Sequence, residues 1–126
     1  MAVASGLPLV PEHARTPETA WAATTRGTGE LIAAAVRDGA QQVFVAVGGS
    51  ATTDGGAGAL AALDERDVDV RLSVICDVTV PFEDAPRIFA PQKGADPPMV
   101  ARLRERLDAL ADKAPKVTEL DDLGSL

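Results

Sequence analysis

Apolar positions along the chain alternate between a helical spacing and short continuous runs. Between residues 28 and 39 they recur on one helix face, which predicts a helix that ends near Gly39. Residues 42–47 form a continuous apolar run, as in a strand covered on both faces. An alanine and leucine pattern returns at 56–65, which favours a second helix, and residues 68–76 alternate partly, as a second strand would.

The C-terminal half predicts one long helix and little other regular structure. Residues 97–113 carry an apolar stripe with charged residues mostly off it, and Asp96 followed by proline is a favourable helix start. Two stretches that hold several prolines, 11–25 and 77–95, are predicted as loops.

Alternation of helices and strands implies crossover connections and therefore a parallel sheet. We expect an α/β fold, with part of a mostly parallel sheet flanked by helices. Because two strands make a small sheet, we interpret residues 1–116 as part of an α/β domain. Residues 117–126 are expected to form a loosely held tail.

Composition and charge narrow the classes of function. The formal net charge of −7 argues against nucleic-acid binding, which needs a basic surface. The single cysteine, Cys76, excludes an intrachain disulfide and fits a reducing cytoplasm. No run reaches the roughly 18 apolar residues of a membrane span, and no signal peptide is evident. One histidine and one cysteine do not make a usual zinc site, so we predict no zinc centre.

The glycine-rich segment 48–56, GGSATTDGG, separates the first predicted strand from the next helix. In open α/β sheets, ligands bind beyond the carboxyl ends of the strands. Glycines let the backbone approach an anion, and the following helix directs free N–H groups at it. Hydroxyl donors and Asp54, which could bind a hydroxyl or Mg²⁺ or act as a base, complete a candidate site. The alternative is a structural turn in which Asp54 caps the helix.

Two further charged residues are candidates for the same site. Asp77 follows the second predicted strand, again at a carboxyl end, and could bind a metal or a hydroxyl. Lys93 lies in a Pro-Gln-Lys-Gly segment and is either a solvated charge or a point charge for phosphate. We expect Asp54, Asp77 and Lys93 to face one cleft.

The other conspicuous side chains receive structural interpretations. Trp21 is expected to pack, and Cys76 to be a small buried hydrophobe. Arg102, Arg104 and Arg106 are interpreted as the solvated face of the long helix.

Five stretches, in order along the chain, resemble the bacterial glycerate kinase family. The most specific is GGSATTDGGAGAL at 48–60. The others are ASGLPLVP at 4–11, TTRGTGELI at 24–32, CDV at 76–78 and FAPQKGAD at 89–96.

This resemblance implies ATP-dependent phosphorylation of glycerate to a phosphoglycerate, with ATP and Mg²⁺ as cofactors and glycerate as a small-molecule substrate. It implies catalytic roles for Asp54, Asp77 and Lys93, and substrate-binding roles for their neighbours. These neighbours are Gly48, Gly49, Ser50, Thr52, Thr53, Gly55, Gly56 and Gln92.

The resembled family is longer than this chain, and its phosphate-handling segments precede the point that matches Met1. The spacing between the glycine-rich segment and CDV is also short for the family. We therefore interpret the chain as an internal fragment without measurable activity alone. It is expected to self-associate or to pair with a companion chain, because sheet edges and apolar faces would be exposed. The alternative function is that of a catalytically inactive α/β fragment that acts as a binding or pairing module.

Overall fold

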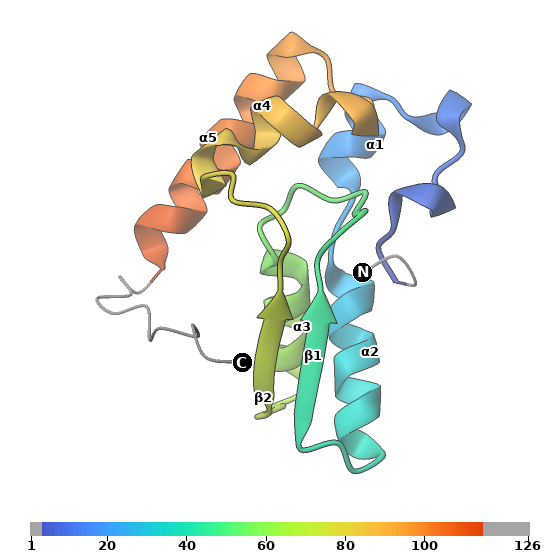
Figure 1. Cartoon of the computed structure of the whole chain (residues 1–126), viewed down its shortest axis with the longest axis vertical. Helices are drawn as coiled ribbons and strands as arrows, with labels where there is room; N and C mark the ends of the chain where they lie inside the picture. The colour runs from blue at the N-terminus through green and yellow to red at the C-terminus, as the bar shows by residue number, and fades with distance from the viewer. Residues whose placement is uncertain (1–3, 115–126) are drawn as a thin grey trace.

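The fold is built on two parallel strands with two helices packed behind them (Figure 1). The structure is a computed structural model that describes residues 4–114. Strands β1 (Gln42–Ala46) and β2 (Arg71–Ile75) pair in parallel, with Gln42 opposite Arg71 and Ala46 opposite Ile75. Helix α3 (Ala57–Glu65) connects the strands, and α2 (Arg26–Arg37) precedes β1. The predicted α/β class, with a parallel sheet flanked by helices, is confirmed.

The remaining helices gather beyond the carboxyl ends of the strands (Figure 1). They are α1 (Pro17–Ala22), α4 (Ala85–Phe89) and α5 (Pro97–Lys113). Four short 3₁₀ turns join this group: Leu7–Leu9, Glu12–Ala14, Phe82–Asp84 and Pro91–Lys93. The interpretation of 11–25 and 77–95 as loops was therefore wrong in part, since each contains a helix.

A proline at the start of each unexpected helix explains this error. Pro17 occupies the first turn of α1, where a missing backbone N–H costs nothing. Thr16 caps that helix: its hydroxyl accepts from the Thr19 N–H at 3.2 Å, and its own N–H donates to the Thr19 hydroxyl at 2.8 Å. Pro86 lies in the first turn of α4 in the same way.

The other element boundaries lie close to those expected. Helix α2 begins at Arg26, two residues before the expected start at Thr28. Strand β2 is shorter than the predicted 68–76, and α5 begins as predicted, with the Asp96 carboxylate accepting from the Met99 N–H at 2.9 Å. The expected division at 116/117 lies outside the described residues. Within residues 4–114, no helix combines the length and the apolar character needed to cross a membrane.

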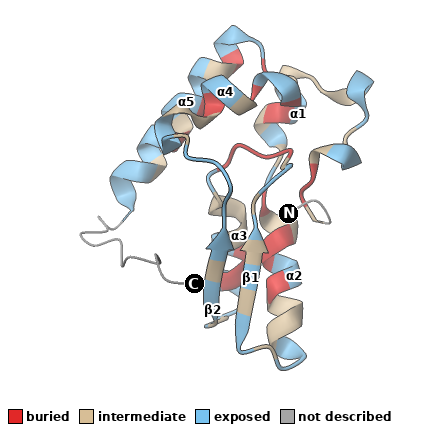
Figure 2. Ribbon diagram, viewed as in Figure 1, coloured by how far each residue is buried: buried red, intermediate tan, exposed pale blue. Residues whose placement is uncertain are grey.

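Most of the buried hydrophobic residues form two groups rather than surrounding the whole sheet, and the loop at residues 51–54 is buried as well (Figure 2). One group joins α1, α4 and α5, and Trp21 packs against it, as expected; its buried members are Ala20, Ala90, Ala95, Met99 and Leu103. The other lies between α2 and α3, where Ile32, Ala62 and Leu63 are buried.

The face of the sheet that points away from α2 and α3 is open in the described part of the chain. Phe44 and Ile75 lie on this face, and they are 64% and 56% exposed. The expectation that the strand at 42–47 is covered on both faces was therefore wrong for Phe44. Cys76, which follows β2, was expected to be buried but is exposed.

Candidate anion-binding site

The glycine-rich segment 48–56 leaves β1 at its carboxyl end and leads into α3, as predicted. It is tied to the N-terminal segment by two backbone bonds. The Ala51 N–H donates to the Ser5 carbonyl, and the Leu7 N–H donates to the Gly49 carbonyl, each at 2.8 Å. Three of its glycines, Gly49, Gly55 and Gly56, have positive φ. Most other residues would be strained at these three positions. The segment is thus an ordered loop that depends on its glycines.

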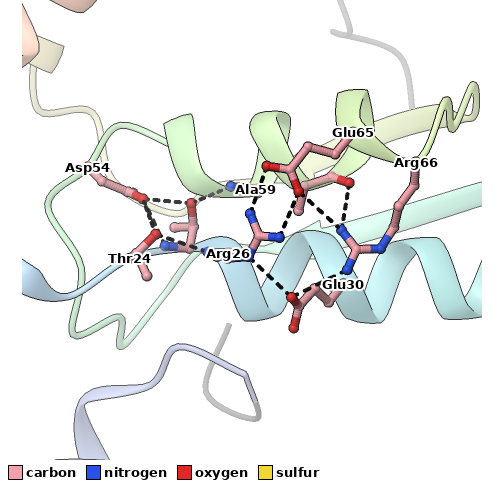
Figure 3. Close-up of polar contacts among 9 residues, drawn as sticks. Thr24, Arg26, Glu30, Asp54, Ala59, Glu65 and Arg66 are labelled. Atoms are coloured by element: carbon pink, nitrogen blue, oxygen red, sulfur yellow. Dashed lines mark hydrogen bonds and ion pairs between the residues drawn. The ribbon is translucent and has the colours of Figure 1, made fainter.

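Asp54 lies in this loop and links the first turns of α2 and α3 (Figure 3). Its Oδ2 accepts from the Thr25 N–H at 2.8 Å, the Thr25 hydroxyl at 2.9 Å and the Gly58 N–H at 3.2 Å. The Thr24 hydroxyl is a weaker donor at 3.3 Å, and Oδ1 accepts from the Gly56 N–H at 3.1 Å. The carboxylate therefore satisfies helix N-terminal N–H groups, as the structural alternative requires.

These donors also set the charge state of Asp54. Burial alone would raise the pKa of this carboxyl, but the hydrogen bonds from Thr25, Gly56 and Gly58 outweigh burial and hold the pKa below its ordinary value. A carboxylate so stabilised is a weak proton acceptor. Its catalytic role stays a prediction.

Helix α3 approaches α2 closely enough to form these contacts because residue 58 is glycine. A Cβ at this position would overlap the Thr24 hydroxyl and lie 2.8 Å from the Arg26 nitrogen. Exposed ion pairs between the same two helices follow further along (Figure 3): Arg26 with Glu65 at 2.7 Å and Arg66 with Glu30 at 3.5 Å. Because these pairs are exposed, they orient the helices more than they stabilise them.

Lys93 reaches the loop from the opposite side and is only 7% exposed. Its ammonium donates to the Thr52 carbonyl, to the Thr53 hydroxyl at 3.4 Å and to the Ser50 hydroxyl at 3.5 Å. Burial lowers the pKa of Lys93 to about 8, although the negative charge of Asp54 opposes this shift. Of the two interpretations offered by the sequence, the solvated charge is excluded.

Arg106 of α5 is a site residue that the sequence interpretation missed. It was expected on a solvated face, but it is half-buried, and its Nη2 donates to the Thr53 carbonyl at 2.6 Å. Its Nη1 donates to the Trp21 carbonyl at 2.9 Å. The sequence holds one signal for this position: residue 106 lies three residues after Leu103 and next to Leu107, both buried, so it borders the apolar stripe.

The predicted site residues are distributed over two adjoining cavities. The larger, of about 430 Å³, is lined by Asp54 and Lys93 together with Ser50, Thr52, Thr53, Gly55 and Gly56. The smaller, of about 240 Å³, is lined by Asp77 and Lys93 together with Gly48, Gly49, Ser50 and Gln92. Lys93 and Ser50 line both cavities, whereas Asp54 and Asp77 share neither. The expected single cleft is thus two cavities that meet at Lys93.

The donor set at this site is suited to an anion rather than a metal ion. Among residues 4–114, no cluster of three or more His, Cys, Asp or Glu side chains could hold a metal. Asp54 Oδ2 already accepts from backbone and hydroxyl donors, so it has little capacity for Mg²⁺. The Asp54 carboxylate, as it is engaged in this structure, therefore does not fit the role of a magnesium ligand.

The sequence model of the glycerate kinase family matches residues 1–69 and 62–124. The chain belongs to the glycerate kinase family. It is 37% identical to the glycerate 2-kinase of Escherichia coli, with 96% of this chain and 40% of that protein covered. The identity to the glycerate kinase of Bacillus subtilis is 39%, with 92% and 38% covered.

A solved structure supports the same assignment. The crystal structure described as a glycerate kinase 2 from Salmonella typhimurium matches with a TM-score of 0.76 at 36% identity. This match covers 88% of the chain and 38% of the crystallised protein. The chain therefore spans about two fifths of the length of these relatives.

The comparison also locates a difference within the matched region. The alignment with the E. coli relative spans 154 positions, more than the 126 residues of this chain, so the relative carries additional residues inside it. The two family matches share residues 62–69, at the end of α3 and the start of its connection to β2.

Proposed function

We propose that the chain contributes the acceptor-binding part of a glycerate kinase, which transfers a phosphoryl group from ATP to a hydroxyl of glycerate. The observation that carries this proposal is the Lys93 ammonium, buried against the glycine-rich loop in a member of this family. Glycerate is a small carboxylate with hydroxyl groups. It needs a cation and a few polar partners, and Lys93 with Ser50 and Thr53 supplies both.

Phosphoryl transfer depends mainly on positioning and charge neutralisation. In this proposal the glycerate carboxylate replaces the two long contacts of the Lys93 ammonium, those to the Ser50 and Thr53 hydroxyls, and the freed hydroxyls orient the acceptor. Asp54 holds the loop to α2 and α3 in its ionised form. ATP is the phosphoryl donor, and the chain's residues bind and orient the acceptor hydroxyl toward it.

A second proposal is that the chain binds the anion or pairs with another chain without turnover. It is favoured by the engaged Asp54 carboxylate, which has little capacity to act as a base, and by the exposed Phe44 and Ile75 on the open sheet face. A companion chain of the same family, or a second copy, would cover this face.

Calorimetric titration of D-glycerate tests the acceptor site. We expect Lys93→Met to weaken binding at least about tenfold at neutral pH, since a charge-assisted hydrogen bond contributes about 1.5–3 kcal/mol. Lys113→Met is the matched control, because it removes an exposed lysine at the end of α5. Equal affinity in the two variants would contradict the proposed site.

A coupled ATP-turnover assay with glycerate tests whether these residues suffice for phosphoryl transfer. We expect no turnover from these residues alone, because phosphoryl transfer requires several charge-neutralising groups together. Turnover that Lys93→Met abolishes would show that these residues suffice, and it would exclude the pairing module.

A further inference from the structure

Two consecutive carbonyl groups of the loop accept hydrogen bonds from two different cations. The Thr52 carbonyl accepts from Lys93, and the Thr53 carbonyl accepts from Arg106 at 2.6 Å. Lys93 belongs to the Pro91–Lys93 turn, and Arg106 belongs to α5. The two peptide groups between Thr52 and Asp54 are therefore each held by a hydrogen bond from a separate element, the Pro91–Lys93 turn and α5.

Arg106 is itself held in a fixed orientation by Trp21. Its second bond goes to the Trp21 carbonyl, and its guanidinium lies 4.4 Å from the centroid of the Trp21 ring. Arg102, one turn earlier on α5, lies at the same 4.4 Å distance from that ring, but its guanidinium has no hydrogen bond to the loop among the described contacts. The planar guanidinium thus spans two carbonyls, one in α1 and one in the loop.

The burial of Arg106 carries a cost that packing alone does not explain. Burial lowers the pKa of Arg106 despite the nearby charge of Asp54. Among the described residues, its Nε is buried and has no hydrogen-bond partner. A buried donor without a partner is unfavourable, so the bond to Thr53 must offset this cost.

We propose that Arg106 is a positioning residue for the acceptor site: it fixes the Thr53 peptide and so keeps the Thr52 carbonyl and the Thr53 hydroxyl against Lys93. The role in catalysis rests on the proposed function, whereas the effect on the loop does not. Without Arg106, the loop opens, water reaches Lys93, and the geometry that receives the carboxylate is lost.

The test compares Arg106→Ala with Arg102→Ala in the 126-residue chain. Both changes remove an arginine from the Trp21 ring, but only Arg106→Ala removes a hydrogen bond to the loop. We expect Arg106→Ala to speed amide hydrogen exchange in residues 50–56 at least about tenfold, with α2 unchanged. Arg102→Ala should leave the exchange in 50–56 as it is.

The reactivity of Lys93 provides a second readout that a purely structural role would not move. The rate at which an acylating reagent modifies Lys93 depends on its neutral fraction, and it is followed against pH by mass spectrometry. We expect the midpoint to rise from about 8 toward the ordinary 10.5 in Arg106→Ala. Arg106→Lys, which keeps a donor for the Thr53 carbonyl, should restore most of the parent behaviour and serves if the alanine variant does not fold.

The outcomes distinguish the positioning role of Arg106 from the proposed function of the chain. Unchanged loop exchange and an unchanged Lys93 midpoint in Arg106→Ala, or equal changes in Arg102→Ala, would overturn the positioning role. Exchange that rises equally in α2 would reduce Arg106 to general stabilisation and would also overturn it. If both local readouts change but the parent chain does not bind glycerate, Arg106 positions the loop and the proposed substrate is wrong.

Discussion

The buried ammonium of Lys93 predicts a rise in stability at alkaline pH. In the folded chain the pKa of Lys93 is about 8, whereas in the unfolded chain it returns to about 10.5. Between these values the unfolded chain binds a proton at Lys93 that the folded chain does not. The free energy of unfolding therefore increases with pH in this window.

The size of the effect follows from the two pKa values. A tenfold change in a proton-binding constant corresponds to about 1.4 kcal/mol, so the full difference is about 3 kcal/mol. Below about pH 8 both states are charged at Lys93, and above about 10.5 both are neutral, so the contribution is constant outside the window. The chain has no tyrosine, so no phenol titrates there.

Urea unfolding, followed by circular dichroism at several pH values across this window, measures the effect. The rise in the free energy of unfolding with pH should be absent in Lys93→Met and present in Lys113→Met. At neutral pH, Lys93→Met leaves the Thr52 carbonyl without its donor, at a cost of about 1–3 kcal/mol. The same substitution removes a buried charge, which is a gain that offsets this cost. The free energy of unfolding of Lys93→Met at neutral pH should therefore stay within about 2 kcal/mol of the parent value. A flat parent curve, or an equal rise in Lys93→Met, would refute the reasoning.

Three further changes test the loop and its surroundings. Asp54→Asn should destabilise the chain by about 2–4 kcal/mol in urea unfolding, because an amide offers only one acceptor atom to donors that now share a carboxylate; a loss below about 1 kcal/mol would argue against the structural role. Gly94→Ala should cost at least about 2 kcal/mol more than Gly39→Ala: both glycines have φ near +108°, but only at Gly94 would a Cβ overlap backbone, that of Arg15. Phe44→Ser should reduce self-association in size-exclusion chromatography and change stability by no more than about 0.5 kcal/mol, because the side chain is exposed; unchanged association would exclude the open sheet face as the contact.

The strand, loop and helix around the glycine-rich segment could be predicted because their signals are local. The apolar run, the glycine cluster and the returning alanine and leucine pattern each act within a few residues. Helices α1 and α4 were missed for an equally local reason. Pro17 and Pro86 were interpreted as helix breakers, although proline in a first turn is favourable.

The arrangement of the site could be predicted only in part, because it depends on contacts between distant elements. The carboxyl end of β2 lies beside the start of the loop, so Asp77 shares a cavity with Gly48 and Gly49. Asp54 comes several residues later, where the loop has turned toward α2. The role of Arg106 depends on how α5 packs against Trp21, and no pattern within α5 contains that information.

The loop is closed by partners that lie far toward the C-terminus, and this separation affects how the protein emerges during synthesis. Lys93 Nζ and the Thr52 carbonyl are 41 residues apart, and Arg106 and Thr53 are 53 residues apart. At about 5–20 residues per second, the ribosome adds Arg106 roughly 3–10 s after Thr53. Once β2 has been added, a nascent chain can pair β1 with β2, yet its glycine-rich loop still lacks the bond from Arg106. The loop therefore gains its full set of contacts only after Arg106 has been added, and chains released before residue 106 would lack the bond to the Thr53 carbonyl.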